Sequence, residues 1–386
     1  MDARALEQHA AARSGEYLEA LEAMVNVDCG SYSPEGVGRI ADLCEGFFLG
    51  NGWDVERRGH RPLDGDPQLG DLLVATLSGA GGARILLLGH MDTVFDDGTA
   101  AARPFHIDGN RALGPGVSDM KGGLLGGLYA TRALQDAGLD AFDRITFVCN
   151  PDEEIGSPFS GPMIGELAGR HDVAFVLECA RSTGAIVSAR KGVTDYVIRI
   201  RGRAAHAGVE PSRGRSAVLE AAHKAIAISA LAGRWPGVTC NVGVLRGGTR
   251  PNVVPEDAVL EVDLRSPELA TLEEAEAEVE RICREHTIPD IEVELRHDGW
   301  HRPMEKTPAS QRLVDLAVEV AGELGFGVED VATGGASDGN TTSAAGCPTL
   351  DGLGPIGGGA HAADEWLDLS SVVPRVAMLA GIIARL

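Results

Sequence analysis

The feature that most constrains the fold is a set of short, almost entirely apolar runs. They occupy residues 84–89, 145–149 and 173–177. Strands covered on both faces have this composition, because no alternate position faces water. A helical pattern at 123–134 separates the first two runs, as expected where helices connect the strands of an α/β sheet. The sequence therefore predicts an α/β domain with buried strands.

A second domain is expected within the first. The chain has 386 residues, more than one hydrophobic core usually organises. From about Lys191 the predicted order becomes strand, helix, strand, strand, helix, strand, which is typical of a ferredoxin-like α+β module. Alternation of helices and strands returns after Arg302-Pro303. We therefore expect a catalytic domain of residues 1–190 and 303–386 and an inserted lid domain of residues 191–302.

Charge and cysteine content exclude several classes of protein. Subtracting 57 acidic from 34 basic side chains leaves a net charge of −23, which repels nucleic acid and anionic membrane surfaces. Seven cysteines, never in a CxxC pair, indicate neither a disulfide framework nor a thiolate zinc site. The longest apolar stretches are too short to cross a bilayer. These observations favour a cytoplasmic protein without nucleic-acid or membrane partners.

Polar clusters follow the predicted buried strands or lie between them. In an α/β sheet, the carboxyl ends of the strands form the usual binding crevice. A further cluster lies in a glycine-rich loop near the C-terminus. The clusters are Gly89-His-Met-Asp-Thr-Val94, residues 114–123, Asn150-Pro-Asp-Glu-Glu-Ile-Gly156, Leu177-Glu-Cys179 and residues 357–365.

The imidazoles and carboxylates of these clusters form a ligand set suited to Zn²⁺, Mn²⁺ or Co²⁺. If Asp119 bridges two divalent ions, His90 and Glu178 can complete one site, while Glu154 and His361 complete the other. Three ligand carboxylates and a bridging hydroxide then balance the charge of two divalent ions. Such a balance suits a hydrolytic two-metal centre.

Two further acids have expected roles beside these ligands. Glu153 can act as general base toward the bridging water and later as acid to a leaving amine. Asp92 can accept the second ring N–H of His90 and fix its tautomer. Taken alone, each motif is also typical of a turn or a helix N-cap. Their joint occurrence at strand ends favours the metal centre.

These residues resemble the M20 metallopeptidases, and within them the glutamate carboxypeptidase branch. The resemblance rests on five ordered motifs: GHMDTVF, GPGVSDMKGG, PDEEIGS, the strand-end VLE and GGGAHAADE. It implies a zinc-peptidase catalytic domain with a mixed, mostly parallel sheet, two divalent ions, zinc first and cobalt or manganese as alternatives, and the catalytic acids Glu153 and Asp92. The implied metal ligands are His90, Asp119, Glu154, Glu178 and His361.

The same resemblance implies functional residues in the lid. His206, in Ala204-Ala-His-Ala-Gly208, matches a histidine that helps to hold the oxyanion, commonly across a homodimer formed through the lid. Asn252 matches a further substrate-binding position. Arg302 and Arg265 match arginines that bind the substrate carboxylate, although a salt bridge inside the lid is the alternative for Arg265. Gly335 matches a glycine loop that faces the substrate.

The expected function is hydrolysis of an amide or peptide bond, releasing a C-terminal amino acid, glutamate being one candidate, from a small N-acyl or peptidyl substrate. Arg190-Lys191-Gly192 is more like the acetylornithine deacetylase and succinyl-diaminopimelate desuccinylase branches. An N-acyl-amino-acid deacylase is therefore the alternative. A catalytically silent protein that binds metal or peptides is a further one, against which the presence of the base and every ligand argues.

Overall fold

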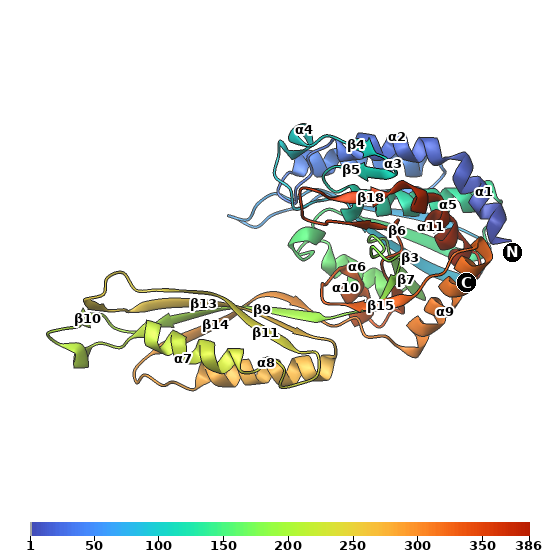
Figure 1. Ribbon diagram of the computed structural model, residues 1–386. Helices are drawn as coiled ribbons and strands as arrows, with labels where there is room; N and C mark the ends of the chain where they lie inside the picture. Colours follow the sequence, from blue (N-terminus) through green and yellow to red (C-terminus); the bar gives the residue numbers. More distant parts are fainter. Residues whose placement is uncertain (1) are drawn as a thin grey trace. The chain divides into compact units, whose positions relative to one another are not determined.

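The computed structural model describes residues 2–386, which form two compact units (Figure 1). The larger unit contains residues 2–188, Lys306–Ala332 and Ser337–Leu386, and the smaller contains Ala189–Glu305 and Thr333–Ala336. The segment Thr333–Ala336, which the sequence assigned to the first domain, groups with the smaller unit because its backbone carbonyls bond to that unit. Lys191, for example, donates its N–H to the Thr333 carbonyl.

A six-stranded mixed sheet forms the centre of the larger unit. In spatial order the strands are β1 (Asp54–Arg58), β2 (Leu72–Ser78), β6 (Phe142–Asn150), β3 (Ala83–His90), β7 (Val173–Val176) and β16 (Thr349–Leu350). The pairs β1–β2 and β2–β6 are antiparallel, and the pairs β6–β3, β3–β7 and β7–β16 are parallel. The prediction of an α/β fold with a mixed, mostly parallel sheet is confirmed.

Both faces of this sheet are buried. In β3, Ile85 and Leu87 belong to one hydrophobic cluster, whereas Leu86 and Leu88 belong to another on the opposite face. This alternation explains the continuous apolar run, because the side chains on both faces of the strand are buried away from water. The first face packs on α1 (Ala3–Ala12), α2 (Ser14–Val25), α3 (Pro34–Gly50), α5 (Gly122–Asp136), α9 (Pro308–Leu324) and α11 (Leu369–Ile383), and the second on α6 (Gly161–Ala168).

Short elements complete the larger unit. The helices α1 and α2 meet at Arg13, whose guanidinium binds Asp136 and Glu16. A small sheet has the order β17-β18-β5-β4, and β8 pairs with β15. The bounds are α4 (Thr99–Ala102), β4 (His106–Asp108), β5 (Arg111–Leu113), β8 (Ile186–Arg190), β15 (Asp330–Thr333), α10 (Asp338–Ala344), β17 (Gly357–Gly358) and β18 (Trp366–Asp368).

The smaller unit has its own core between an antiparallel sheet and two helices. The spatial strand order β11-β13-β9-β14, with one helix after the first strand and one after the third, is that of a ferredoxin-like module. The strands β10 and β12 pair with each other as a separate antiparallel ribbon. The bounds are β9 (Gly192–Arg201), β10 (Ala205–His206), α7 (Ala217–Ser229), β11 (Thr239–Gly247), β12 (Val253–Val254), β13 (Asp257–Ser266), α8 (Leu269–Arg284) and β14 (Glu292–His301).

The seven cysteines are buried as free thiols, so none forms a disulfide. Across residues 2–386, no helix is both long enough and apolar enough to span a membrane.

Candidate metal centre

The carboxyl ends of three neighbouring strands bring the first acidic and imidazole groups together. His90 is the last residue of β3 and lies in register with Asn150, the last residue of β6. Glu153 and Glu154 follow β6 in a short 3₁₀ turn, and Glu178 follows β7. Parallel strands end at one edge of a sheet, so these groups converge although the sequence separates them.

Asp119 lies between two histidines from distant parts of the chain. Its Oδ1 is 3.2 Å from His90 Nε2, and its Oδ2 is 3.3 Å from His361 Nε2. His90 Nε2 is also 3.6 Å from Glu178 Oε1, and His361 Nε2 is 3.1 Å from Glu154 Oε2. The structure thus brings all five sequence-predicted ligands into one cluster, with Asp119 shared between two halves.

These separations fit divalent ions. A tetrahedral zinc ion with bonds of about 2.0–2.2 Å separates neighbouring ligand atoms by roughly 3.3–3.6 Å. The two distances from Asp119 and the His90–Glu178 and His361–Glu154 distances, 3.1–3.6 Å, scatter about these values. In addition, donor atoms of His90, Asp119 and Glu154 all lie within 4.8 Å of one another, as do those of His90, Glu153 and Glu178. The donor set therefore suits divalent metal ions, and His90 is common to both groups of donor atoms.

Asp92 organises the turn that carries the two glutamates. Its fully buried carboxylate accepts hydrogen bonds from the backbone N–H groups of Glu153 and Glu154, both at 3.1 Å, and from the Ser31 hydroxyl at 2.7 Å. His90 Nδ1 lies 2.9 Å from the Asp92 backbone carbonyl and 3.4 Å from its carboxylate. Asp92 therefore contacts Nδ1 of His90, as the sequence predicts, and its carboxylate also holds the backbone of Glu153, the predicted base.

The pKa values in the cluster reflect an excess of negative charge. Burial, together with the nearby carboxylates of Glu178 and Asp338, raises the pKa of Glu153 well above its ordinary value. Burial opposes a charged His90, but hydrogen bonds to Asp119 and Asp92 outweigh it and raise its pKa. Hydrogen bonds to Asp119 and Glu154 raise the pKa of His361 to about 10. Such a cluster attracts cations.

Glu365 is a structural member of the site that the sequence did not single out. Its buried carboxylate accepts hydrogen bonds from the backbone N–H groups of Gly116 (2.8 Å), Ser118 (2.8 Å) and Asp119 (2.9 Å). Burial raises its pKa to about 7. The residue belongs to the same GGGAHAADE motif as His361, so one loop carries a predicted ligand and positions the backbone of another, Asp119.

Two more side chains support the site from outside it. Asp338, fully enclosed, accepts hydrogen bonds from Asn150 Nδ2 at 2.6 Å and Ser157 Oγ at 2.7 Å, and so supports the turn after β6. Arg103 donates to the carbonyl of Ala363 at 2.8 Å in the His361 loop. The sequence offered no signal for Arg103, because its contact joins segments 260 positions apart.

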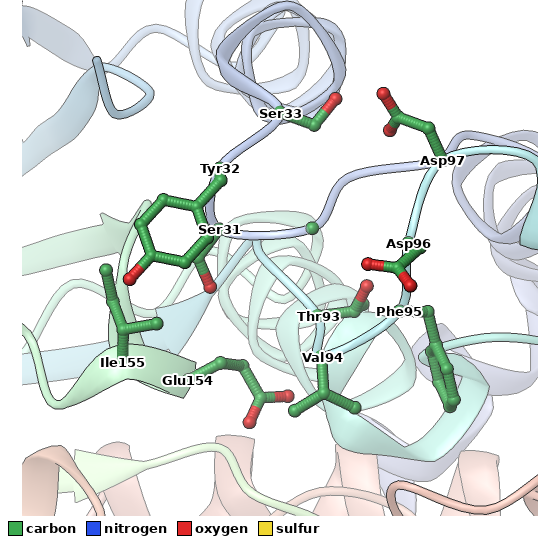
Figure 2. A pocket seen from close by; sticks show the side chains of 11 residues that line it. Ser31, Tyr32, Ser33, Thr93, Val94, Phe95, Asp96, Asp97, Glu154 and Ile155 are labelled. Atoms are coloured by element: carbon green, nitrogen blue, oxygen red, sulfur yellow. The ribbon is translucent and has the colours of Figure 1, made fainter. Parts of the chain in front are cut away.

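A cavity of about 330 Å³ opens beside the cluster within the larger unit. Figure 2 shows Tyr32 and Ile155 on one side of it, Asp96 and Asp97 on the other, and Glu154 at its floor. Because Glu154 also contacts His361, the cavity and the candidate metal centre share a wall. The size lies at the lower end of the range for small-molecule pockets.

The remaining predicted residues lie in the smaller unit. His206, on β10, is exposed, and the N–H of the next residue, Ala207, donates to the Asn252 carbonyl at 3.0 Å. Gly208 N–H donates to His206 Nδ1 at 3.2 Å. Since a backbone N–H can only donate, the neutral imidazole carries its proton on Nε2.

The two predicted carboxylate-binding arginines already have acidic partners inside this unit. Arg265 forms a bidentate contact with Asp263, with distances of 2.7–3.0 Å, and donates to the Gly334 carbonyl at 2.8 Å. Arg302 makes longer contacts with Glu276 and Glu273, at 3.4 and 3.7 Å, and stacks on Trp300. Gly335 accepts a hydrogen bond from Arg190 through its carbonyl.

The fold and the cluster define a class, the metal-dependent α/β hydrolases with a ferredoxin-like insertion. The model of peptidase family M20/M25/M40 matches residues 86–385. The chain belongs to this family, whose peptidases depend on metal ions, and it is an enzyme of that hydrolytic class.

Relatives within the family include different kinds of amide hydrolase. Carboxypeptidase G2 of Pseudomonas sp. (strain RS-16) is 29% identical over 370 residues, covering 95% of this chain and 88% of that protein. Acetylornithine deacetylase of Salmonella paratyphi B is 28% identical over 269 residues, covering 64% and 67%. The solved aminopeptidase PepT of Bacillus cereus superposes with a TM-score of 0.77 at 24% identity, covering 96% and 98% of the two chains, and bears on the fold alone.

Proposed function

We propose that this chain hydrolyses an amide or peptide bond and releases a C-terminal amino acid, glutamate being one candidate, from a small N-acyl or peptidyl substrate. The observation that carries the proposal is the position of Asp119 between His90 and His361, with Glu153 beside them. Similarity to carboxypeptidase G2 over 95% of the chain supports release of a C-terminal residue.

The proposed ligands are His90, Asp119 and Glu178 for one ion and Asp119, Glu154 and His361 for the other. Zinc is the proposed metal, with cobalt and manganese as alternatives. When bound, such ions supply Lewis-acid activation of the attacking water and of the scissile carbonyl.

Glu153 is the proposed proton-transfer residue. It accepts the proton of the attacking water and then donates that proton to the leaving amine. Its raised pKa suits this exchange, because a base that has to become an acid works best when both forms are accessible. Asp92, through its hydrogen bonds to the turn, keeps the Glu153 backbone in place during both steps.

The smaller unit is proposed to act as the lid and as the surface of a homodimer. His206 has its ring proton on Nε2, so it can donate a hydrogen bond to an oxyanion, and we propose that it acts on the partner's site. Asn252 lies beside it and is the proposed second polar contact.

Substrate carboxylate binding is assigned to Arg302 first and to Arg265 second. A guanidinium binds a carboxylate through two parallel hydrogen bonds. Arg302 contacts Glu276 and Glu273 at 3.4 and 3.7 Å, and Arg265 contacts Asp263 at 2.7 Å, so a substrate carboxylate has to replace a shorter contact at Arg265 than these two. Gly335 is the proposed contact to the substrate backbone. A cytoplasmic location is proposed because the cysteines are unpaired thiols.

An N-acyl-amino-acid deacylase is the second candidate, which the similarity to acetylornithine deacetylase favours. The two functions share one chemistry and differ in which half of the substrate is selected. Comparing kcat/KM across N-acyl and α- or γ-linked amino acids separates them: a carboxypeptidase discriminates among leaving amino acids, and a deacylase among acyl groups.

Replacement of the base tests the proposal. Glu153→Gln should bind the same amount of metal as the wild type and lose at least about a hundredfold in kcat, the usual contribution of a positioned general base. The exposed Glu22→Gln is the matched control and should keep full turnover. Full activity in Glu153→Gln, with metal content measured on the same sample, would refute the assignment.

A further inference from the structure

The cavity beside the cluster has a lining that neither the metal ligands nor the base explain. Its apolar surface comes from Tyr32, Val94, Phe95 and Ile155. Tyr32 and Val94 are exposed, at 64% and 42%, so both present apolar area to whatever enters. An aliphatic or aromatic segment entering here would leave water against these four side chains.

The polar part of the lining carries one sign of charge. Asp96 and Asp97 lie across the cavity from Tyr32 (Figure 2). Neither carboxylate has a hydrogen bond or ion pair with another of the residues 2–386. The residues that line the cavity, all within the described range 2–386, include no lysine, arginine or histidine. A positive group in the cavity would therefore meet two unpaired carboxylates, and a negative group would be repelled by both.

Glu154 connects the cavity to the candidate metal centre. The residue lines the floor and contacts His361 at 3.1 Å, so a substrate whose carbonyl lies over the cluster can extend from there into the cavity. The backbone bridge between Gly30 and Thr93 joins two of the lining segments, and Arg103 stacks on Phe95 at 4.7 Å while it holds the His361 loop. The walls are thus tied to the segments that carry the proposed ligands.

We infer that this cavity binds the acyl half of the substrate and selects an acyl chain that carries a cationic amine, as in a short peptide or an ω-amino acyl group. The inference rests on the proposed amide hydrolysis and adds a substrate class to it. Asp96 and Asp97 bind the ammonium group, and the apolar walls contact the methylene chain. Anionic acyl groups such as succinyl are disfavoured.

Three amides of one leaving amino acid test the inference, because their acyl chains have similar length and different charge. They carry 4-aminobutanoyl (cationic), pentanoyl (neutral) and succinyl (anionic) groups. With the metal-loaded enzyme, kcat/KM should fall in that order, by about tenfold from the cation to the anion. Binding of the same amides to Glu153→Gln, measured by calorimetry, should give Kd values in the matching order.

Charge removal identifies the residues responsible. Asp96→Asn and Asp97→Asn should each reduce the ratio of kcat/KM for 4-aminobutanoyl over pentanoyl, and the double variant should bring it close to one. Asp140→Asn is the matched control, since Asp140 is exposed and lies before the opposite end of β6. It removes the same charge and should leave the ratio unchanged.

The outcomes separate this inference from the proposed function. If pentanoyl and succinyl amides are cleaved as well as the cationic one, or if the aspartate variants keep the ratio, the inference is wrong while the hydrolase stands. If no amide is cleaved, the proposed function fails, and the order of Kd values still decides for or against a cation-selective cavity.

Discussion

Glu365 Oε1 accepts a hydrogen bond from the backbone N–H of Asp119 across 2.9 Å, and so one acid of the centre fixes the backbone of another. The two residues are 246 positions apart in the chain. Asp119 has to present one oxygen to each histidine, and Glu365 holds the loop in which that is possible. Loss of this contact should therefore weaken metal binding.

Glu365→Gln tests this relationship. The amide cannot accept from three backbone N–H groups as a carboxylate does, so we expect about 1–3 kcal/mol lower free energy of unfolding. Metal affinity should fall by roughly 10–100-fold, as on loss of an outer partner of a ligand. Chelator competition gives the affinity and urea denaturation the stability. The exposed neighbour Asp364→Asn should behave as the wild type.

Removal of His361 should change metal stoichiometry. His361→Ala leaves Asp119 and Glu154 alone on one side of the cluster, so bound metal should fall from two equivalents to about one. Elemental analysis of dialysed protein measures this directly. His106→Ala removes an exposed histidine of β4 and should retain two equivalents. Retention of both ions by the His361 variant would contradict the ligand assignment.

Metal should stabilise the wild-type fold. Burial, together with the nearby carboxylates of Glu178 and Asp338, raises the pKa of Glu153, and bound cations should relieve the repulsion among these carboxylates. Binding to the folded state alone adds about 2.7 kcal/mol when free metal is a hundred times Kd. Thermal unfolding with chelator and with added zinc should show this as a higher Tm with zinc, together with recovery of activity.

The buried pair Glu220 and Lys224 predicts a pH dependence in the smaller unit. Burial opposes ionisation of Glu220, but hydrogen bonds from Ile288 N–H and Lys224 outweigh it and lower its pKa. The stabilisation is therefore present above the unfolded-state pKa of about 4.3 and is lost as pH falls through the folded value. Glu220→Gln should cost about 3–5 kcal/mol at neutral pH, as for a broken buried pair.

The difference between wild type and Glu220→Gln should shrink as the pH falls below about 4, because the wild-type carboxyl is then protonated too. Urea denaturation at several pH values measures it. The exposed Glu294→Gln on β14 should show no such trend. An undiminished difference at low pH would mean that the ionised carboxylate is not the source of the stability.

Action of His206 on a partner site can be tested by mixing chains. If it acts in trans, His206→Ala and Glu153→Ala chains, each inactive, form mixed dimers with one intact site. Random pairing makes about half of the dimers mixed, so about a quarter of wild-type activity should return after co-refolding. Mixtures that stay inactive would place the histidine in its own chain's site.

The sequence predicted β3, β6 and β7 of the central sheet because these strands are buried and apolar on both faces. It also predicted that the five proposed ligand side chains lie together, since strand ends in an α/β sheet meet at one edge. Glu365 and Arg103 were missed because their roles depend on tertiary contacts that no local pattern contains.

All seven sulfhydryl groups are buried within the two units, and this has a practical use. A maleimide dye should label the native protein slowly, so one engineered surface cysteine can carry a probe without prior removal of the natural ones. Placing one such probe on each unit would test, by energy transfer, whether the distance between the units changes during turnover.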